Sequence, residues 1–158
     1  MALEIEHKFL LANDSWRQYV SHSVRYRQGY LSSAVTSSIR VRISAEHAWL
    51  NIKSATIGTC RHEYEYPIPL TDANEMLDNL CLKPLIEKTR HFVSVDGFQW
   101  EIDEFEGVNQ GLCVAEIELP EIGVAFTKPD WLGQEVTDDV RYYNNALAQN
   151  PYCNWQHT

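Results

Sequence analysis

Apolar and charged residues alternate with a period of two along much of this chain. The segment EIEHKFL at residues 4–10 puts Glu4, Glu6 and Lys8 on one side of an extended chain and Ile5 and Phe9 on the other. Successive side chains of a β-strand point to opposite faces of its sheet, so the segment predicts a strand with one charged face. Taken alone, it fits an ordinary half-buried strand whose charges face water. Recurrence of the pattern therefore decides its meaning.

Strand patterns rich in β-branched and aromatic residues recur in two groups separated by small polar turns. The first group predicts an antiparallel run of four strands at 22–31, 37–44, 48–55 and 61–69. The second predicts three strands at 85–95, 98–105 and 112–120. Between the first two of these, Asp96 and Gly97 form a strong signal for a tight hairpin turn.

Three other segments have helical signals. A brief helix is expected within 13–20, where Asn13, Asp14 and Ser15 can cap it. The segment 71–80 predicts a helix that packs one apolar face. Its candidate caps are Thr71 and Asp72 with Glu75 completing the capping pattern, and its apolar face comprises Met76, Leu77 and Leu80. The segment 130–150 is expected to be helical in pieces, with Thr137 and Asp138 as caps of a final helix.

Charged residues share one face on about seven of the predicted strands. Whole strands carry either two acids, as in EYEYP and AEIEL, or two bases, as in RVR and EKTR. A face that was merely wetted would mix the two signs at random. The set comprises the acids Glu4, Glu6, Glu63, Glu65, Asp103, Glu116 and Glu118 and the bases Lys8, Arg40, Arg42, Lys53, Lys88 and Arg90.

The opposite, apolar faces of these strands must be covered. The helical segments can cover them from outside if the sheet curls into a barrel with its charged face inward. Charges that face one another in a lumen are costly unless they are paired or occupied by a charged ligand. Clustered carboxylates bind hard divalent cations such as Mg²⁺ or Mn²⁺, whereas Arg and Lys bind phosphate oxygens. The pattern therefore predicts a polyphosphate, with its metal, inside a barrel.

Composition and charge narrow the class of protein. A chain of 158 residues that is 44% hydrophobic is expected to form one domain, 1–158, with a real core. The net charge is −9, and the thirteen lumen charges sum to −1, which leaves −8 for the exterior. Such a surface repels nucleic acid, so we expect no nucleic-acid partner.

The sequence has no signal for membrane insertion or for structural cysteines. No stretch approaches the roughly 18 apolar residues of a membrane span, and charges occupy the start of the chain where a signal peptide needs an apolar core. We therefore expect a cytoplasmic protein without a membrane partner. The four cysteines (Cys60, Cys81, Cys113 and Cys153) have neither zinc-ligand spacing nor a disulfide pattern.

With EIEHK, RVR, IK, EYEYPIP, EKTR, WEIDEF and AEIEL in this order, the chain resembles the CYTH superfamily, the triphosphate tunnel metalloenzymes, over nearly its whole length. Its tail also looks like the carboxyl-terminal helix of the short bacterial members. The resemblance implies a mainly β fold of the α+β class, namely a closed eight-stranded antiparallel barrel with a charged lumen and helices outside. It also implies that the lumen holds a linear triphosphate, which is cleaved with Mg²⁺ or Mn²⁺.

Residues of this chain match the functional positions of that family. Metal-binding carboxylates are matched by Glu4, Glu6, Glu116 and Glu118, and phosphate-binding bases by Lys8, Arg40, Arg42, Lys53, Lys88 and Arg90. Glu63, Glu65 and Asp103 match lumen acids whose division among metal, water and structural roles stays open. We expect Glu65 at the metal, and Glu63 and Asp103 with Lys88 and Arg90 at the chemical step. Tyr30 matches a tyrosine near the site, although a core position explains it equally well.

The resemblance favours hydrolysis of inorganic tripolyphosphate to pyrophosphate and phosphate, by attack of water on a terminal phosphorus. Class IV adenylate cyclase and thiamine triphosphatase are the alternatives within the family. A non-catalytic module that binds polyphosphate is the alternative outside it. No phosphate-loop, nucleophile-elbow or HExxH motif competes with this interpretation. A homodimer is common among similar proteins, but no exposed apolar stripe in the sequence proves one.

Overall fold

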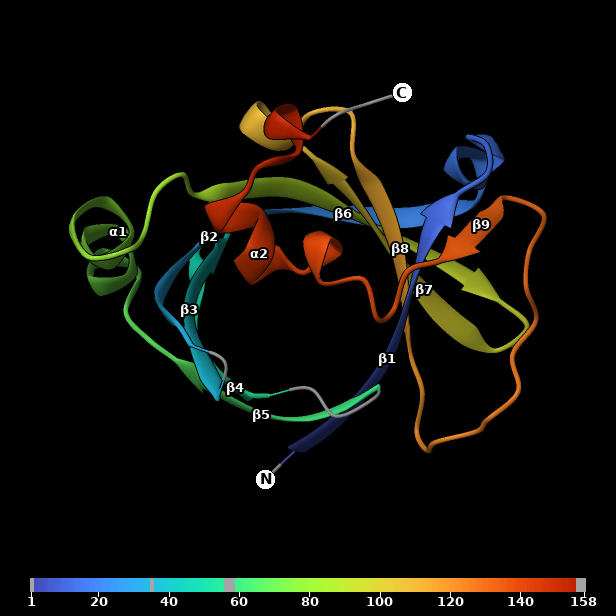
Figure 1. The fold of residues 1–158 in the computed structure, drawn as a ribbon, viewed down its shortest axis with the longest axis horizontal. Helices are drawn as coiled ribbons and strands as arrows, with labels where there is room; N and C mark the ends of the chain where they lie inside the picture. The colour runs from blue at the N-terminus through green and yellow to red at the C-terminus, as the bar shows by residue number, and fades with distance from the viewer. Residues whose placement is uncertain (1, 35, 56–58, 156–158) are drawn as a thin grey trace.

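The computed structural model describes residues 2–34, 36–55 and 59–155, and in this part of the chain eight antiparallel strands close into a barrel (Figure 1). The hydrogen-bonded order is β5-β4-β3-β2-β6-β7-β8-β1, and pairing of β1 with β5 closes the ring. The strands are β1 Ala2–Leu11, β2 Val20–Ser33, β3 Ser37–Ser44, β4 His47–Ser54, β5 Cys60–Pro67, β6 Ile86–Val95, β7 Phe98–Phe105 and β8 Cys113–Glu118. The predicted closed barrel is therefore confirmed.

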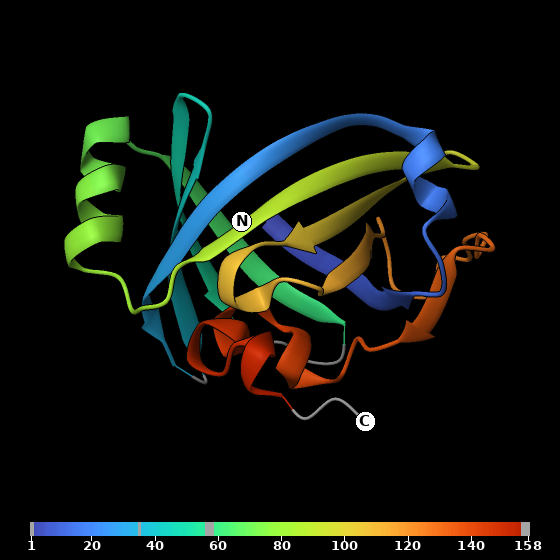
Figure 2. The same ribbon diagram turned by 90° about the horizontal axis from the view of Figure 1, so that it is seen from above.

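Short helices and a ninth strand complete the described fold. The 3-10 helices are η1 Ser15–Tyr19, η2 Gly107–Asn109, η3 Val140–Tyr142 and η4 Tyr152–Asn154, and the other elements are α1 Leu70–Asn79, α2 Asn144–Gln149 and β9 Leu132–Glu135. Figure 2 shows α1 standing against the outer wall of the barrel. Among the described residues, no helix is both long and apolar enough to span a bilayer.

The hairpin between β6 and β7 has the predicted two-residue turn. Val95 pairs with Phe98, and both Asp96 and Gly97 have positive φ angles, of 48° and 82°. Two successive left-handed residues match the twist of the flanking strands, which explains the preference for an Asp-Gly pair. The turn fixes the register of β6 against β7 and so places Arg90 opposite Asp103.

The segment 130–150 is less helical than its sequence predicts. Its first part forms β9. This strand pairs with Phe9 and Leu11 of β1, beyond the residues of β1 that pair with β5. Gly133 permits this approach, because a Cβ atom there would lie 2.8 Å from the Leu10 carbonyl oxygen. The predicted caps are wrong: Tyr143 precedes α2, and the Thr137 hydroxyl accepts a hydrogen bond from the backbone N–H of Lys8 instead. Pairing with a strand edge has overridden local helical preference.

The capping expected for the helix at 71–80 is also wrong. The helix begins one residue earlier, after Pro69, and no side chain caps its amino terminus. Leu77 is fully buried as predicted, but Leu80 lies beyond the helix end and is 65% exposed. Pro69 occupies the N-cap position, where its backbone carbonyl accepts a hydrogen bond from the N–H of Ala73.

Two of the three hydrophobic clusters among the described residues lie outside the barrel wall. One cluster joins Ile5 and Phe9 of β1 to Trp100 and Ile102 of β7, with Trp16 of η1 packed over them. A second cluster packs Leu77 of α1 against the outer faces of β3 and β4. Since the apolar strand faces are buried outward, the charged faces are left to line the lumen.

One mouth of the barrel is closed by the carboxyl-terminal segment. In Figure 1, α2 lies across the ring of strands instead of on its outer wall. Leu147 and Ala148 pack with Ile86, Phe105 and Val114, which occupy the lumen side of β6, β7 and β8. The expectation that every helix covers the outside is therefore wrong for α2. Apolar residues at the lumen end of these strands provide the surface on which α2 packs.

Candidate active site in the barrel lumen

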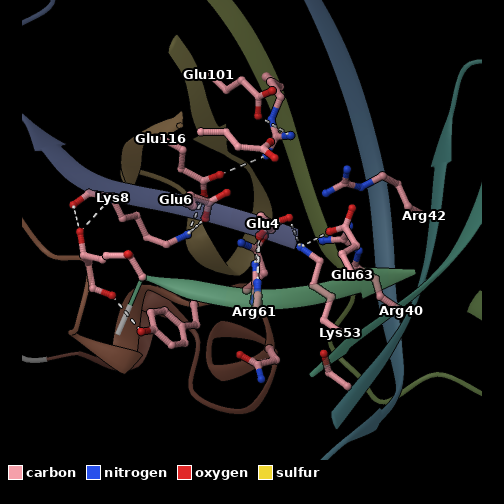
Figure 3. A pocket seen from close by; sticks show the side chains of 18 of the residues that line it. Glu4, Glu6, Lys8, Arg40, Arg42, Lys53, Arg61, Glu63, Glu101 and Glu116 are labelled. Atoms are coloured by element: carbon pink, nitrogen blue, oxygen red, sulfur yellow. Dashed lines mark hydrogen bonds and ion pairs between the residues drawn. The ribbon is translucent and has the colours of Figure 1, made fainter. Parts of the chain in front are cut away.

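A highly charged cavity occupies the lumen, and its walls come from all eight barrel strands and from the segment around α2 (Figure 3). Seven basic and six acidic side chains line it: Lys8, Arg40, Arg42, Lys53, Arg61, Lys88 and Arg90 with Glu4, Glu6, Glu63, Glu101, Glu116 and Glu118. Uncharged lining residues include Tyr30, Ser38, Thr137, Tyr143 and Asn144. The structure thus brings together eleven of the thirteen predicted charged residues and Tyr30.

Strand register determines which charges face one another. Lys8 of β1 lies opposite Glu116 of β8, and Lys53 of β4 lies opposite Glu63 of β5. Side chains directly opposite in an antiparallel pair are close enough to interact. Accordingly, Lys8 Nζ donates to Glu116 Oε1 at 2.6 Å, and Lys53 Nζ is 2.9 Å from Glu63 Oε2. At these two positions the register sets opposite charges against each other, whereas it sets Glu6 opposite Glu118.

Glu4 is held between two basic side chains. Arg61 Nε donates to Glu4 Oε1 at 2.8 Å, and Lys53 Nζ lies 3.5 Å from Glu4 Oε2. Burial by itself would raise the pKa of Glu4, but the charges of Lys53 and Arg61 outweigh it and hold that pKa well below its usual value. Glu4 is therefore ionised in this environment.

The negative charge of Glu6 is less well balanced by neighbouring cations than that of Glu4. Burial and the negative charge of Glu116 raise the pKa of Glu6 to about 7, while its nearest cation, Lys8, is 3.4 Å away and also binds Glu116. Glu118 opposite it likewise has a raised pKa, through burial and the charges of Glu4 and Glu101. Carboxylates that raise one another's pKa are short of positive charge.

These carboxylates fit a divalent metal by their chemistry. Mg²⁺ and Mn²⁺ prefer oxygen ligands, and Glu4, Glu6, Glu116 and Glu118 supply them from the adjacent strands β1 and β8. Within the described residues, however, no three metal-ligating side chains already converge on one point. Several carboxylates are instead paired with Lys8 or Arg61. An added cation would relieve the crowding of Glu6 and Glu118.

The other side of the cavity is basic. Lys88 Nζ donates to Asp103 Oδ2 at 2.7 Å, and Arg90 binds both Asp103 oxygens, at 2.8 and 3.0 Å. Burial lowers the pKa of Lys88 to about 7 despite the neighbouring Asp103. Burial, together with Arg40 and Arg90, lowers the pKa of Arg42 to about 9. Such a cluster of partly uncompensated cations favours an anion with several negative oxygens.

Two predicted acids do not reach the cavity. Asp103 is completely buried behind Lys88 and Arg90, where it acts as their counter-ion. Glu65 is exposed and accepts a hydrogen bond from Asn51 at 2.8 Å, away from the lining. Strand alternation gives the face of each side chain, but depth along the barrel and shielding by neighbouring bases depend on the tertiary structure. We therefore do not retain the metal role for Glu65 or a direct chemical role for Asp103.

Two charged lining residues, Arg61 and Glu101, were missing from the predicted set. The alternation that selects Glu63 also places Arg61 on the lumen face, and that of Asp103 includes Glu101. Arg61 contacts Glu4, and Glu101 Oε2 lies 2.8 Å from Arg90 Nη1. With both included, the cavity lining carries a formal charge of +1. The net charge of the chain is −9, so the residues outside the lining sum to −10. That remainder includes Asp103, which is buried behind Lys88 and Arg90. Counted with Asp103, the lumen is neutral and the rest of the chain carries −9, one charge more acidic than predicted.

Comparison with known proteins gives a consistent picture. The model of the CYTH domain family matches residues 2–146. A protein of Acetivibrio thermocellus named inorganic triphosphatase is 47% identical over 156 residues, which cover 99% of each chain. A protein of Nitrosomonas europaea with the same name is 38% identical over 149 residues, or 92% of this chain and 96% of its own. A crystal structure of an inorganic triphosphatase has a TM-score of 0.67 at 36% identity and covers 94% of this chain and 95% of its own.

Proposed function

This chain belongs to the CYTH domain family, and on that basis we propose that it is a metal-dependent hydrolase of inorganic tripolyphosphate. The products are pyrophosphate and phosphate. The observation that carries the proposal is the division of the closed lumen into a carboxylate side, on β1 and β8, and a basic side, on β3 and β6. A polyphosphate with a divalent cation satisfies both sides together.

The basic side chains are proposed to bind and align the phosphate chain. Arg40, Arg42 and Lys53 line the wall formed by β3 and β4, and Lys88 and Arg90 line the wall formed by β6. Asp103 holds Lys88 and Arg90 from behind, which restricts their motion. Positioning and charge stabilisation supply most of the rate in phosphoryl transfer. Lys88 and Arg90 would stabilise the oxygens of the leaving pyrophosphate.

The carboxylate side is proposed to hold the metal. Glu4, Glu6, Glu116 and Glu118 would ligate Mg²⁺ or Mn²⁺, which neutralises phosphate charge and polarises the scissile bond when bound. Glu63 lines the same cavity and is proposed to orient the attacking water. Attack in line on a terminal phosphorus forms one P–O bond as the bridging P–O bond breaks. Lys8 remains paired with Glu116 and keeps that carboxylate ionised.

The cavity lining supports an inorganic substrate over a nucleotide. Among its described residues, Tyr30 and Tyr143 are the only aromatic side chains. Tyr30 is 5% exposed and also packs in the apolar cluster beneath α2. A nucleobase needs apolar or aromatic surface as well as hydrogen-bonding groups. These walls instead offer mostly charged groups, with hydroxyl and amide groups between them, and both curated relatives are named inorganic triphosphatase.

Phosphate release tests this proposal directly. Tripolyphosphate, pyrophosphate, ATP and thiamine triphosphate are each supplied with Mg²⁺ or Mn²⁺, Glu4→Gln serves as the control, and cyclic AMP is assayed in the ATP sample. We expect rapid release from tripolyphosphate that is lost in Glu4→Gln. Cyclic AMP formation would establish a cyclase instead. Tight tripolyphosphate binding without turnover would establish a binding module and overturn the proposed activity.

A further inference from the structure

The side chain of Asn144, the first residue of α2, reaches the basic wall of the cavity. Its Oδ1 atom accepts a hydrogen bond from Lys88 Nζ at 2.9 Å and another from Gln28 Nε2 at 3.0 Å. Asn144 lines the cavity beside these contacts. Lys88 and Gln28 are themselves fully buried, so water cannot replace Asn144 without a rearrangement. The carboxyl-terminal segment thus makes a specific polar contact with the predicted phosphate-binding residues.

Gln28 extends this contact to a second basic residue. Its Oε1 atom accepts a hydrogen bond from Arg42 Nε at 2.9 Å, while its amide nitrogen donates to Asn144. The Asn144 oxygen therefore binds Lys88 of β6 directly. It is also linked to Arg42 of β3 through Gln28 of β2. Because an asparagine side chain is short and α2 is packed through Leu147, this oxygen has little freedom to move.

We propose that Asn144 is a positioning residue that orients Lys88, and through Gln28 also Arg42, toward the phosphate chain. The inference rests on the proposed tripolyphosphatase function. Its consequence is that α2 completes the active site instead of only closing the barrel. Asn144 is not expected to touch the reacting atoms.

The hydrogen-bonding capacity of an ammonium group gives the physical reason. Lys88 Nζ has three N–H donors. One is directed to Asp103 and a second to Asn144, which leaves the third for a ligand. A lysine held by Asp103 alone could rotate about its flexible stem, so two fixed acceptors are needed to aim the remaining donor. The same argument applies to Arg42, whose Nε is taken by Gln28.

The charge of Lys88 gives a readout that depends on this contact. The charged groups around its ammonium are Asp103 on β7, Arg90 on β6, Arg42 on β3 and Glu116 on β8. Burial lowers the pKa of Lys88 to about 7, so a small change in its partners alters its charge near neutral pH. A carboxylate in place of the Asn144 amide should raise this pKa, and removal of the amide should lower it.

The experiment compares Asn144→Asp and Asn144→Ala with the wild type, and uses the exposed Gln149→Ala on the same helix as a matched control. The chain has five lysines, so ¹³Cε-lysine NMR can follow Lys88 without substrate, with Lys88→Gln to assign its signal. The pH dependence of kcat/KM for tripolyphosphate is then measured on the same variants. Thermal unfolding confirms that each variant is folded.

We expect the Lys88 pKa to rise by about one unit in Asn144→Asp and to fall in Asn144→Ala. The alkaline limb of kcat/KM should move in the same directions, because it reports groups of the free enzyme. In Asn144→Ala, kcat should fall about 10-fold or more while KM changes less. Gln149→Ala should match the wild type in every measurement.

Two outcomes would overturn this inference, and a third would count against the proposed function instead. An unchanged Lys88 pKa in both folded Asn144 variants would overturn the positioning role, whatever the activity. An unchanged alkaline limb together with unchanged kcat would overturn it as well. If instead the Lys88 pKa moves as expected but the wild-type protein hydrolyses no polyphosphate, the contact is established and the proposed hydrolase function is what fails.

Discussion

Arg61 binds Glu4 through two nitrogen atoms, with Nε and Nη2 each 2.8 Å from Glu4 Oε1. The pair spans β5 and β1 at the point where these strands close the barrel, because Glu4 and Arg61 are cross-strand partners. Glu4 is also a proposed metal ligand. Its guanidinium partner therefore occupies a carboxylate oxygen that a metal ion would need, and the two cations compete for one side chain.

Removal of that competitor should strengthen metal binding. In Arg61→Gln we expect the dissociation constant for Mn²⁺, measured by electron paramagnetic resonance without substrate, to fall about threefold or more. Arg141→Ala removes an exposed arginine that pairs with Asp139 and should leave this constant unchanged. Weaker Mn²⁺ binding in Arg61→Gln would show that Arg61 orders Glu4 for the metal instead of competing with it.

Loss of the Lys88 ammonium should affect turnover more than binding. In Lys88→Ala we expect kcat for tripolyphosphate to fall about 100-fold or more, because charge that develops on the leaving oxygens loses its stabilising group. KM should rise less than tenfold, since other bases still hold the phosphates. Steady-state kinetics with the exposed Lys128→Ala as control provide the test. A rise in KM with kcat unchanged would restrict Lys88 to uniform binding.

The depressed pKa of Lys88 also predicts the pH dependence of activity. Burial lowers this pKa to about 7, so the free enzyme loses the Lys88 charge as pH rises through 7, and kcat/KM should fall on the alkaline side. Arginine stays protonated, so in Lys88→Arg the limb should move toward the next titrating base, Lys53, whose pKa burial and the charges of Arg40 and Arg61 lower to about 8. The pH at which kcat/KM falls provides this test even if the larger arginine side chain lowers the rate at every pH. A limb unchanged in Lys88→Arg would assign it to another group.

Packing of α2 across the barrel mouth should contribute measurably to stability. Leu147 is fully buried against lumen-side residues such as Ile86 and Phe105. Leu147→Ala removes this packing and should lower the free energy of unfolding in urea by about 2–4 kcal/mol. The neighbouring exposed Gln149→Ala should change it by less than about 0.5 kcal/mol. Equal free energies of unfolding for Leu147→Ala and Gln149→Ala would mean that α2 packs only loosely on the barrel.

Much of the site follows from a single physical regularity of the sequence. Side chains alternate across a strand, so burial of Ile5 and Phe9 on one face commits Glu4, Glu6 and Lys8 to the other. Applied to seven strands, this regularity predicts a charged lumen and most of its lining. Applied without exception, it would also have selected Arg61 and Glu101, because each lies two residues from a charged residue that was chosen.

The sequence by itself determined the strands, the charged face of each strand and hence the kind of ligand that the lumen accepts, because alternation and burial are local properties of the chain. Only the tertiary structure decided that Asp103 lies hidden behind Lys88 and Arg90, that Glu65 stays outside the cavity and that Asn144 reaches the basic wall. These relationships depend on register between strands, on depth along the barrel and on the path of α2 across its mouth. Each is set by contacts between residues far apart in the chain, which no local pattern encodes.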